Sequence, residues 1–206
     1  MRKPWNACVV LSWLMFSFGC SDGGGASSGS ALGISMSLSP PPGGSTDVVW
    51  VARGGGGGDV LVVDVMARAI TQDFDSFNIE IQFDPLVLEA RRYTSLGVLD
   101  ACAGGLGVLA CDNVTTCGSS ANSTGTILAG ESIIGPLPPG CTVSGEQVLG
   151  QITFRARARG TSALPFVPFN GDPVDPQGSR FARRAPPEPE VPVLFFDSGA
   201  SIEVTR

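Results

Sequence analysis

Cysteine is the residue type whose number and spacing could support chemistry in this chain. The sequence holds six cysteines and no histidine at all. The lack of histidine excludes Ser-His-Asp and Cys-His catalysis, and it excludes histidine-bound metal sites. Cys8 and Cys20 lie close to the N-terminus. The other cysteines lie in the middle of the chain and are the candidates for disulfide bonds: Cys102, Cys111, Cys117 and Cys141.

These four cysteines predict two disulfides if the chain is exported to an oxidising compartment. Three pairings can be formed, and we expect the most local one, Cys102–Cys111 together with Cys117–Cys141. The competing interpretation is a four-cysteine zinc site. The spacing contains no C-x2-C pair, which argues against zinc and against a redox-active dithiol.

Acidic residues offer two further sites for chemistry. Asp73 and Asp75 could form a carboxylate pair of the kind that hydrolyses glycosides, but their surroundings predict a solvated turn. Residues 170–175 faintly resemble a calcium loop, yet Pro173 and Pro176 disrupt the spacing that such a loop needs. We therefore expect no metal, no cofactor and no enzymatic activity.

Residues 1–19 have the pattern of a secretory signal peptide. Arg2 and Lys3 precede a charge-free apolar run over residues 7–18. As a helix this run would rise only ~18 Å, which is too short for the ~30 Å hydrocarbon core of a bilayer. A basic start followed by a short apolar run is typical of a cleaved export signal.

The end of this segment, SFGC, is similar to the lipobox of bacterial lipoproteins. In that class the cysteine is lipidated and becomes the new N-terminus, so Cys20 is the expected lipidation site. Plain secretion with cleavage nearby is the alternative. Residues 20–45 are rich in Gly, Ser and Pro and should form a linker to a folded domain at 46–206. The expected location is the cell envelope, on the outer membrane or the cell surface, or else outside the cell.

The net charge of −6 sets limits on the partner. Removal of residues 1–19 would take away Arg2 and Lys3 and no acid, so the mature chain would be more acidic still. Such a chain is a poor ligand for nucleic acid or for anionic lipid. The only membrane contact that we expect is the N-terminal lipid anchor.

The element that best defines the fold is the segment 75–84. Its apolar residues alternate with polar ones, which predicts a strand with one buried and one wet face. Pro85 has no N–H to donate and ends the strand. The alternating apolar positions are Phe77, Ile79, Ile81 and Phe83.

Further strands are expected between turn signals along the rest of the chain, and no amphipathic helix is found. Residues 54–58, a run of glycines, should be a hairpin loop, and residues 97–125 a long cysteine-bearing loop. Many short strands predict an all-β fold, an antiparallel β-sandwich of about nine strands. The expected strands are 47–52, 59–69, 88–95, 126–134, 147–159, 162–169, 179–184, 193–196 and 200–205, with a further short one at 34–38.

A strand closed by Asp-Pro-x-x-Leu, here residues 84–88, resembles the third-strand signature of the cohesin family, whose β-sandwich modules bind dockerin domains. Motifs at 125–130, 148–156 and 199–204 follow the order of that family. The resemblance implies a cohesin-like jelly roll. The cysteine-bearing insert and the Pro/Arg-rich segment at 172–192 depart from the family's compact pattern.

The resemblance also implies a function: a non-enzymatic scaffold module that recognises a dockerin-like protein through one sheet face. That face is expected to combine the polar sides of strands 75–84 and 147–159. The alternative is that these are ordinary solvated cross-strand pairs. The candidate partner-binding residues are Asn78, Glu80, Gln82, Gln151, Thr153, Arg155 and Arg157.

Two other functions compete with dockerin binding. The cohesin fold is shared with carbohydrate-binding modules, so the chain could serve polysaccharide breakdown. Such modules stack sugars on exposed aromatic rings, for which the mature chain offers Trp50 and Tyr93. A third hypothesis is structural adhesion within an envelope assembly, which predicts self-association.

Overall fold

The computed structural model describes residues 32–117, 120–135, 140–171, 177–183 and 190–206. The expected signal peptide, the lipidation candidate Cys20 and the first part of the expected linker lie outside these residues. Within them no helix is long and apolar enough to cross a membrane.

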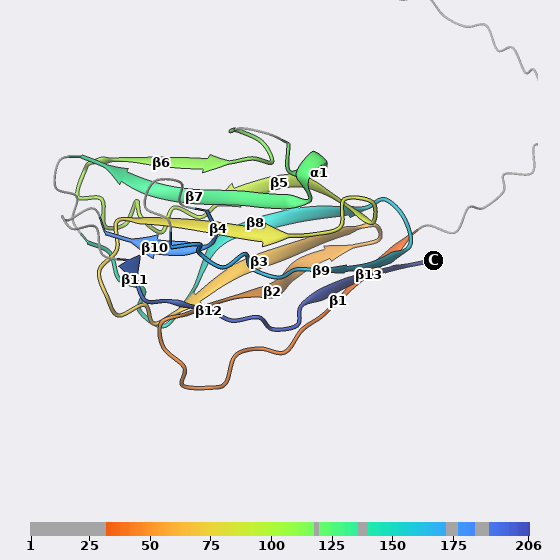
Figure 1. Cartoon of the computed structure of the whole chain (residues 1–206), viewed down its shortest axis with the longest axis horizontal. Helices are drawn as coiled ribbons and strands as arrows, with labels where there is room; N and C mark the ends of the chain where they lie inside the picture. Colours follow the sequence, from red (N-terminus) through yellow and green to blue (C-terminus); the bar gives the residue numbers. More distant parts are fainter. Residues whose placement is uncertain (1–31, 118–119, 136–139, 172–176, 184–189) are drawn as a thin grey trace, which may run out of the picture.

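Two five-stranded sheets form the two layers of a sandwich, and a smaller sheet lies along one side (Figure 1). The first large sheet, which we call the β4–β7 sheet, has the strand order β11-β10-β4-β7-β6. Its strands are β11 (Glu190–Val191), β10 (Arg180–Ala182), β4 (Ser76–Gln82), β7 (Thr126–Ile134) and β6 (Gly107–Asp112).

The second large sheet, the β3–β8 sheet, has the order β12-β2-β3-β8-β5, and the small sheet has the order β1-β13-β9. In the part of the chain that the structure describes, all strand pairs are antiparallel except β12 with β2. A short helix, α1 (Ala121–Thr124), precedes β7. The strands are β12 (Leu194–Phe195), β2 (Val48–Gly57), β3 (Val60–Arg68), β8 (Glu146–Ala156), β5 (Leu88–Ser95), β1 (Gly33–Ser37), β13 (Ser201–Thr205) and β9 (Gly160–Ala163).

The core lies between the two large sheets and is built by period-two alternation. In β4 the side chains of Phe77, Ile79 and Ile81 are buried, as the sequence predicts. Phe77 stacks on Phe181 of β10 with ring centroids 5.5 Å apart. Each fully buried apolar side chain of this size contributes about 1.5–3 kcal/mol. The all-β sandwich expected from the sequence is confirmed.

The glycine run differs from its prediction. It is not a loop: β2 continues through it to Gly57, with a bulge between Arg53 and Gly55. A Cβ on Gly56 would lie 2.4 Å from the carbonyl oxygen of Val60 on the neighbouring strand. Glycine is therefore what allows the two backbones to approach this closely.

The folded domain also begins earlier than expected. Gly33–Ser37 forms β1 and pairs with β13 near the C-terminus, with Ile34 opposite Val204 and Met36 opposite Ile202. Both Ile34 and Met36 pack against the core. The expected boundary at residue 46 is therefore too late, because the strand Gly33–Ser37 lies within the expected linker. The described residues hold thirteen strands rather than about nine.

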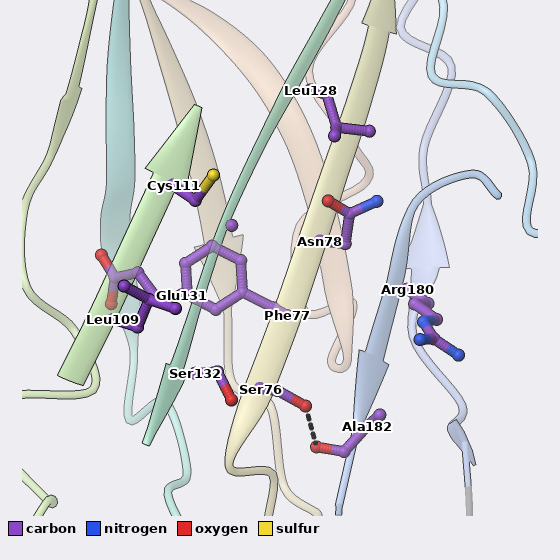
Figure 2. A pocket seen from close by; sticks show the side chains of 11 residues that line it. Ser76, Phe77, Asn78, Leu109, Cys111, Leu128, Glu131, Ser132, Arg180 and Ala182 are labelled. Carbon is purple, nitrogen blue, oxygen red and sulfur yellow. Dashed lines mark hydrogen bonds between the residues drawn. The ribbon is translucent and has the colours of Figure 1, made fainter. Parts of the chain in front are cut away.

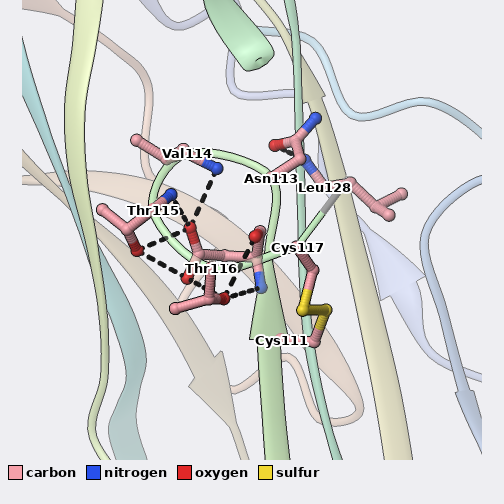
Figure 3. The surroundings of a disulfide bond; sticks show 8 residues. Cys111, Asn113, Val114, Thr115, Thr116, Cys117 and Leu128 are labelled. Atoms are coloured by element: carbon pink, nitrogen blue, oxygen red, sulfur yellow. Dashed lines mark hydrogen bonds between the residues drawn. A yellow bond between two sulfur atoms is a disulfide. The ribbon is translucent and has the colours of Figure 1, made fainter. Parts of the chain in front are cut away.

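The four cysteines form two disulfides, as expected, but the expected pairing is wrong. The bonds are Cys102–Cys141 and Cys111–Cys117, with Cα–Cα distances of 5.7 and 5.8 Å. Cys111 is the last residue but one of β6, and the following turn returns the chain so that Cys117 lies beside it (Figure 3).

The buried Asp112 carboxylate organises this turn. Its Oδ1 accepts hydrogen bonds from the backbone N–H of Val114 and Thr115, and its Oδ2 from the hydroxyl of Thr116. A turn bonded in this way favours the Cys111–Cys117 bond, which leaves Cys102 and Cys141 for each other. The expected pairing fails because sequence distance alone does not show where a turn reverses the chain.

Candidate binding face

The outward face of the β4–β7 sheet holds the candidate site. In β4 the polar residues between the buried ones point outward, and the strand register aligns them with β7 and β6. Asn78 lies opposite Gly130 of β7, and Gly130 lies opposite Cys111 of β6. Leu128 of β7 lies opposite Glu80.

A solvent-open hollow of about 230 Å³ lies on this face (Figure 2). Two leucines at it are well exposed: Leu109 of β6 at 57% and Leu128 of β7 at 41%. Together these two leucines give the hollow an apolar rim on the outward face of the sheet. The hollow is lined by Ser76, Phe77, Asn78, Leu109, Cys111, Leu128, Gly130, Glu131, Ser132, Arg180 and Ala182.

Gly130 keeps the middle of the hollow open. A Cβ at this position would lie 2.4 Å from the Phe77 carbonyl oxygen, so a larger residue would push β7 away from β4. The absence of a side chain here leaves room between Leu128 and Leu109.

Asn78 and Glu80 form hydrogen bonds with the segment that precedes β10. Asn78 Nδ2 donates to the carbonyl oxygen of Gly178 at 2.9 Å, and the Gly178 N–H donates to Glu80 Oε2 at 2.7 Å. Ser179 Oγ donates to the Glu80 carbonyl oxygen at 3.0 Å. These bonds fix the segment that leads into β10. Gln82, at the end of β4, is exposed.

Arg180 brings a positive charge to the hollow. Its guanidinium lies over the ring of Phe169, 5.0 Å from the ring centroid. An aromatic ring attracts a cation above its face, and this attraction helps to hold the guanidinium in position. The face therefore combines apolar contact area with one oriented cation.

The residues expected from β8 do not join this face. β8 pairs with β3 and β5, so Gln151, Thr153 and Arg155 belong to the β3–β8 sheet. The expectation that they lie beside Asn78, Glu80 and Gln82 is wrong. Both strands alternate in the same way, and only long-range pairing decides to which sheet each belongs.

Gln151 and Arg155 of β8, and Arg157 just after it, make contacts within the β3–β8 sheet and its loops. Gln151 Nε2 donates to Asp64 Oδ1, and Arg155 Nε donates to Asp59 Oδ2, each at 2.8 Å. The hydrogen bond from Arg155 lowers the pKa of the Asp59 carboxyl below its ordinary value. Arg157 Nη1 donates to the carbonyl oxygen of Pro85.

Sequence reasoning missed the leucines, the glycine and Arg180. One signal was present: Leu128 stands between two residues that alternation assigns to the core, so its own side chain must face outward. Leu109 lies in a segment that was expected to be a loop, and nothing in its neighbours predicts a strand.

The aromatic residues proposed for sugar stacking are buried. Trp50 is 4% and Tyr93 is 7% exposed. The guanidinium of Arg68 lies 4.9 Å from the ring centroid of Trp50. The carbohydrate-binding alternative therefore has no stacking platform in these two residues.

Asp73 and Asp75 lie in different surroundings. Asp73 makes an ion pair with Arg183 at 2.6 Å, and Asp75 is buried, which corrects its assignment to a solvated turn. In the part of the chain that the structure describes, no three His, Cys, Asp or Glu residues are grouped as a metal site. Asp172 and Asp175 of the faint calcium loop lie outside that part.

Comparison with known proteins gives a fold and no sequence relative. No protein-family model matches the chain, and no curated protein matches it. Among solved structures, the second type II cohesin module of the adaptor ScaA scaffoldin from Acetivibrio cellulolyticus is similar, with a TM-score of 0.50 and 13% identity over 74% of this chain and 88% of that one.

Two further similar structures come from the same organism. A type II cohesin domain of its cellulosome has a TM-score of 0.49 and 12% identity, covering 76% of this chain and 95% of that one. A type II cohesin–X-dockerin complex has a TM-score of 0.46 and 14% identity, covering 66% and 86%. The chain thus has a cohesin-like β-sandwich fold, as its sequence resemblance implied.

Proposed function

We propose that this chain is a non-enzymatic binding module that recognises a dockerin-like protein through the outward face of the β4–β7 sheet. The hollow around Gly130, with the exposed Leu109 and Leu128, carries this proposal. Apolar side chains that are clustered and rigidly held are the usual centre of a protein interface. Asn78 and Glu80 support the surface by fixing β10 rather than by touching the partner.

The proposed location is the cell envelope, reached by export and held by a lipid on Cys20. Two disulfides among the described residues agree with an oxidising compartment. The anchor itself is proposed from the N-terminal sequence.

The test is a pull-down of envelope and secreted proteins from the source cells, in calcium, on the immobilised chain. Leu128→Arg should lower retention of a specific protein at least about tenfold, because it places a charge where a leucine is desolvated. The matched control is Leu194→Arg, which changes a leucine that is 60% exposed on β12 of the other sheet.

A protein with duplicated Asp/Asn-rich calcium loops that is kept by the control, lost with Leu128→Arg and released by chelation supports the proposal. Equal retention by both variants would place the partner elsewhere on the molecule. No specific retention by the folded, oxidised chain would refute recognition of a dockerin-like protein.

A further inference from the structure

The edge of the β4–β7 sheet formed by β6 has no further strand paired with it among the described residues. β6 is the last strand of the β4–β7 sheet and lies at the periphery of the sandwich (Figure 1). Its residues Gly107–Cys111 carry no charge and no proline, and its register with β7 has no bulge. By contrast, the edge strand β5 carries Arg91 and Arg92 and a bulge. Charge, proline and bulges are among the devices that prevent edge pairing, and residues 107–111 of β6 lack all three.

The backbone of β6 offers hydrogen-bonding groups in a defined order. Asn113 N–H donates to the Leu128 carbonyl oxygen, so alternate residues back along β6, including Leu109, bond to β7. Val108 and Ala110 must then direct their N–H and C=O away from the sheet. Among the described residues no hydrogen bond to these groups is present.

The edge is closed at its end by the disulfide turn. Asp112 N–H donates to Thr116 Oγ1 at 3.0 Å, and Thr116 N–H donates to the Asp112 carbonyl oxygen. The open part is therefore short and lies around Leu109. A partner strand can bond only at Val108 and Ala110.

We infer that β6 pairs antiparallel with β6 of a second copy of this chain, about a two-fold axis at Leu109. In that register Val108 of one copy lies opposite Ala110 of the other, and the two symmetric pairs form four hydrogen bonds. The two Leu109 residues lie opposite each other in a pair without hydrogen bonds, with Cα atoms about 4.5 Å apart. An antiparallel register that is shifted away from Leu109 would leave some of the open N–H and C=O groups of Val108 and Ala110 unpaired.

Two observations favour a second copy as the occupant. The open groups of Val108 and Ala110 lie symmetrically about Leu109, so the edge is complementary to itself, and it carries no charge that would place like charges opposite each other in two identical strands. Leu109 is 57% exposed in one copy and would contact its equivalent side by side on the same outward face of the sheet. The pairing continues the β4–β7 sheet across both copies and places two hollows on one side.

The first test measures the mass of the purified, oxidised full chain by analytical ultracentrifugation over a wide concentration range. The wild-type chain should pass from monomer to dimer as the concentration rises. Leu109→Lys places two like charges directly opposite each other and should remain a monomer throughout. Leu128→Lys, on the same face but one strand inward, is the matched control and should still form the dimer.

A second test keeps the inference open to refutation if Leu109→Lys fails to fold. The residues of such a pair are close enough for a disulfide. Leu109→Cys should therefore give a disulfide-linked dimer, with the bond between the two introduced thiols found by mass spectrometry. Leu128→Cys should not. A wild-type chain that is monomeric at all concentrations, or equal cross-linking of both variants, overturns the inference.

Discussion

Among single residues, Glu131 connects the strand that carries the hollow to the interior of the sandwich. It lies in β7 with its side chain turned inward and only 3% exposed. Ser95 Oγ donates to Glu131 Oε1, and Leu99 N–H donates to Oε2 at 3.3 Å. Burial raises the pKa of this carboxyl, and the charge of Asp100 adds to the effect, while backbone N–H bonds oppose it.

The raised pKa makes a prediction about stability and pH. Because the folded-state pKa lies above the unfolded value, ionisation of Glu131 costs stability as pH rises from about 4 towards 7. Glu131→Gln removes this cost. The free energy of unfolding of the variant, relative to wild type, should therefore increase with pH, as measured by urea denaturation across that range.

Glu203→Gln is the control, because it removes the same charge from an exposed position of β13. A difference between Glu131→Gln and wild type that is flat with pH, or that falls as pH rises, would contradict the account of burial as the main cause.

Other residues show how far sequence alone reaches. The number of cysteines predicts two disulfides, but their pairing depends on the turn that Asp112 organises. Alternation predicts that Asn78 and Glu80 face outward. It does not predict that they bond to Gly178, which is distant in sequence.

At the scale of elements, strands with strong alternation are predicted well, and β7 spans the expected 126–134. β6 is missed, because it is short and exposed and is defined by pairing with β7 rather than by its own pattern. β1 is expected as a strand but is placed in the linker. β1 belongs to the domain only because it pairs with β13, which places its two inward side chains against the core.

β1 gives a prediction at this scale. A chain that lacks residues 1–31 should unfold at the same denaturant concentration as the oxidised mature protein. A chain that lacks residues 1–45 loses Ile34 and Met36 from the core and should lose about 2–4 kcal/mol of unfolding free energy. Urea denaturation of both chains checks this, and equal midpoints would show that β1 contributes no stability.

At the scale of the whole molecule, the start of β1 at Gly33 shortens the proposed tether. Gly33 pairs with Thr205 of β13, so the first and last strands meet at one end of the sandwich (Figure 1). An anchor at Cys20 would hold this end of the domain towards the membrane.

The anchor is tested in source cells by labelling with palmitate. Wild-type protein should carry the label and sediment with membranes, whereas Cys20→Ser should carry none and be released, because it lacks the thiol to which the lipid is proposed to attach. Cys8→Ser, inside the expected signal peptide, is the control and should keep the label. Label that persists in Cys20→Ser would exclude this residue as the site of lipidation.

The pairing of Gly33 with Thr205 also has a mechanical consequence. Tension between a bound partner and an N-terminal anchor would enter the domain at Gly33, at the end of the β1–β13 ladder. An antiparallel ladder opens one hydrogen bond at a time when its two strands are pulled apart at the same end, and it shares the load when they are pulled at opposite ends. β1 would be pulled at Gly33, whereas β13 is held by the chain at Ser201, at the opposite end of the ladder, so the β1–β13 hydrogen bonds would bear the load together.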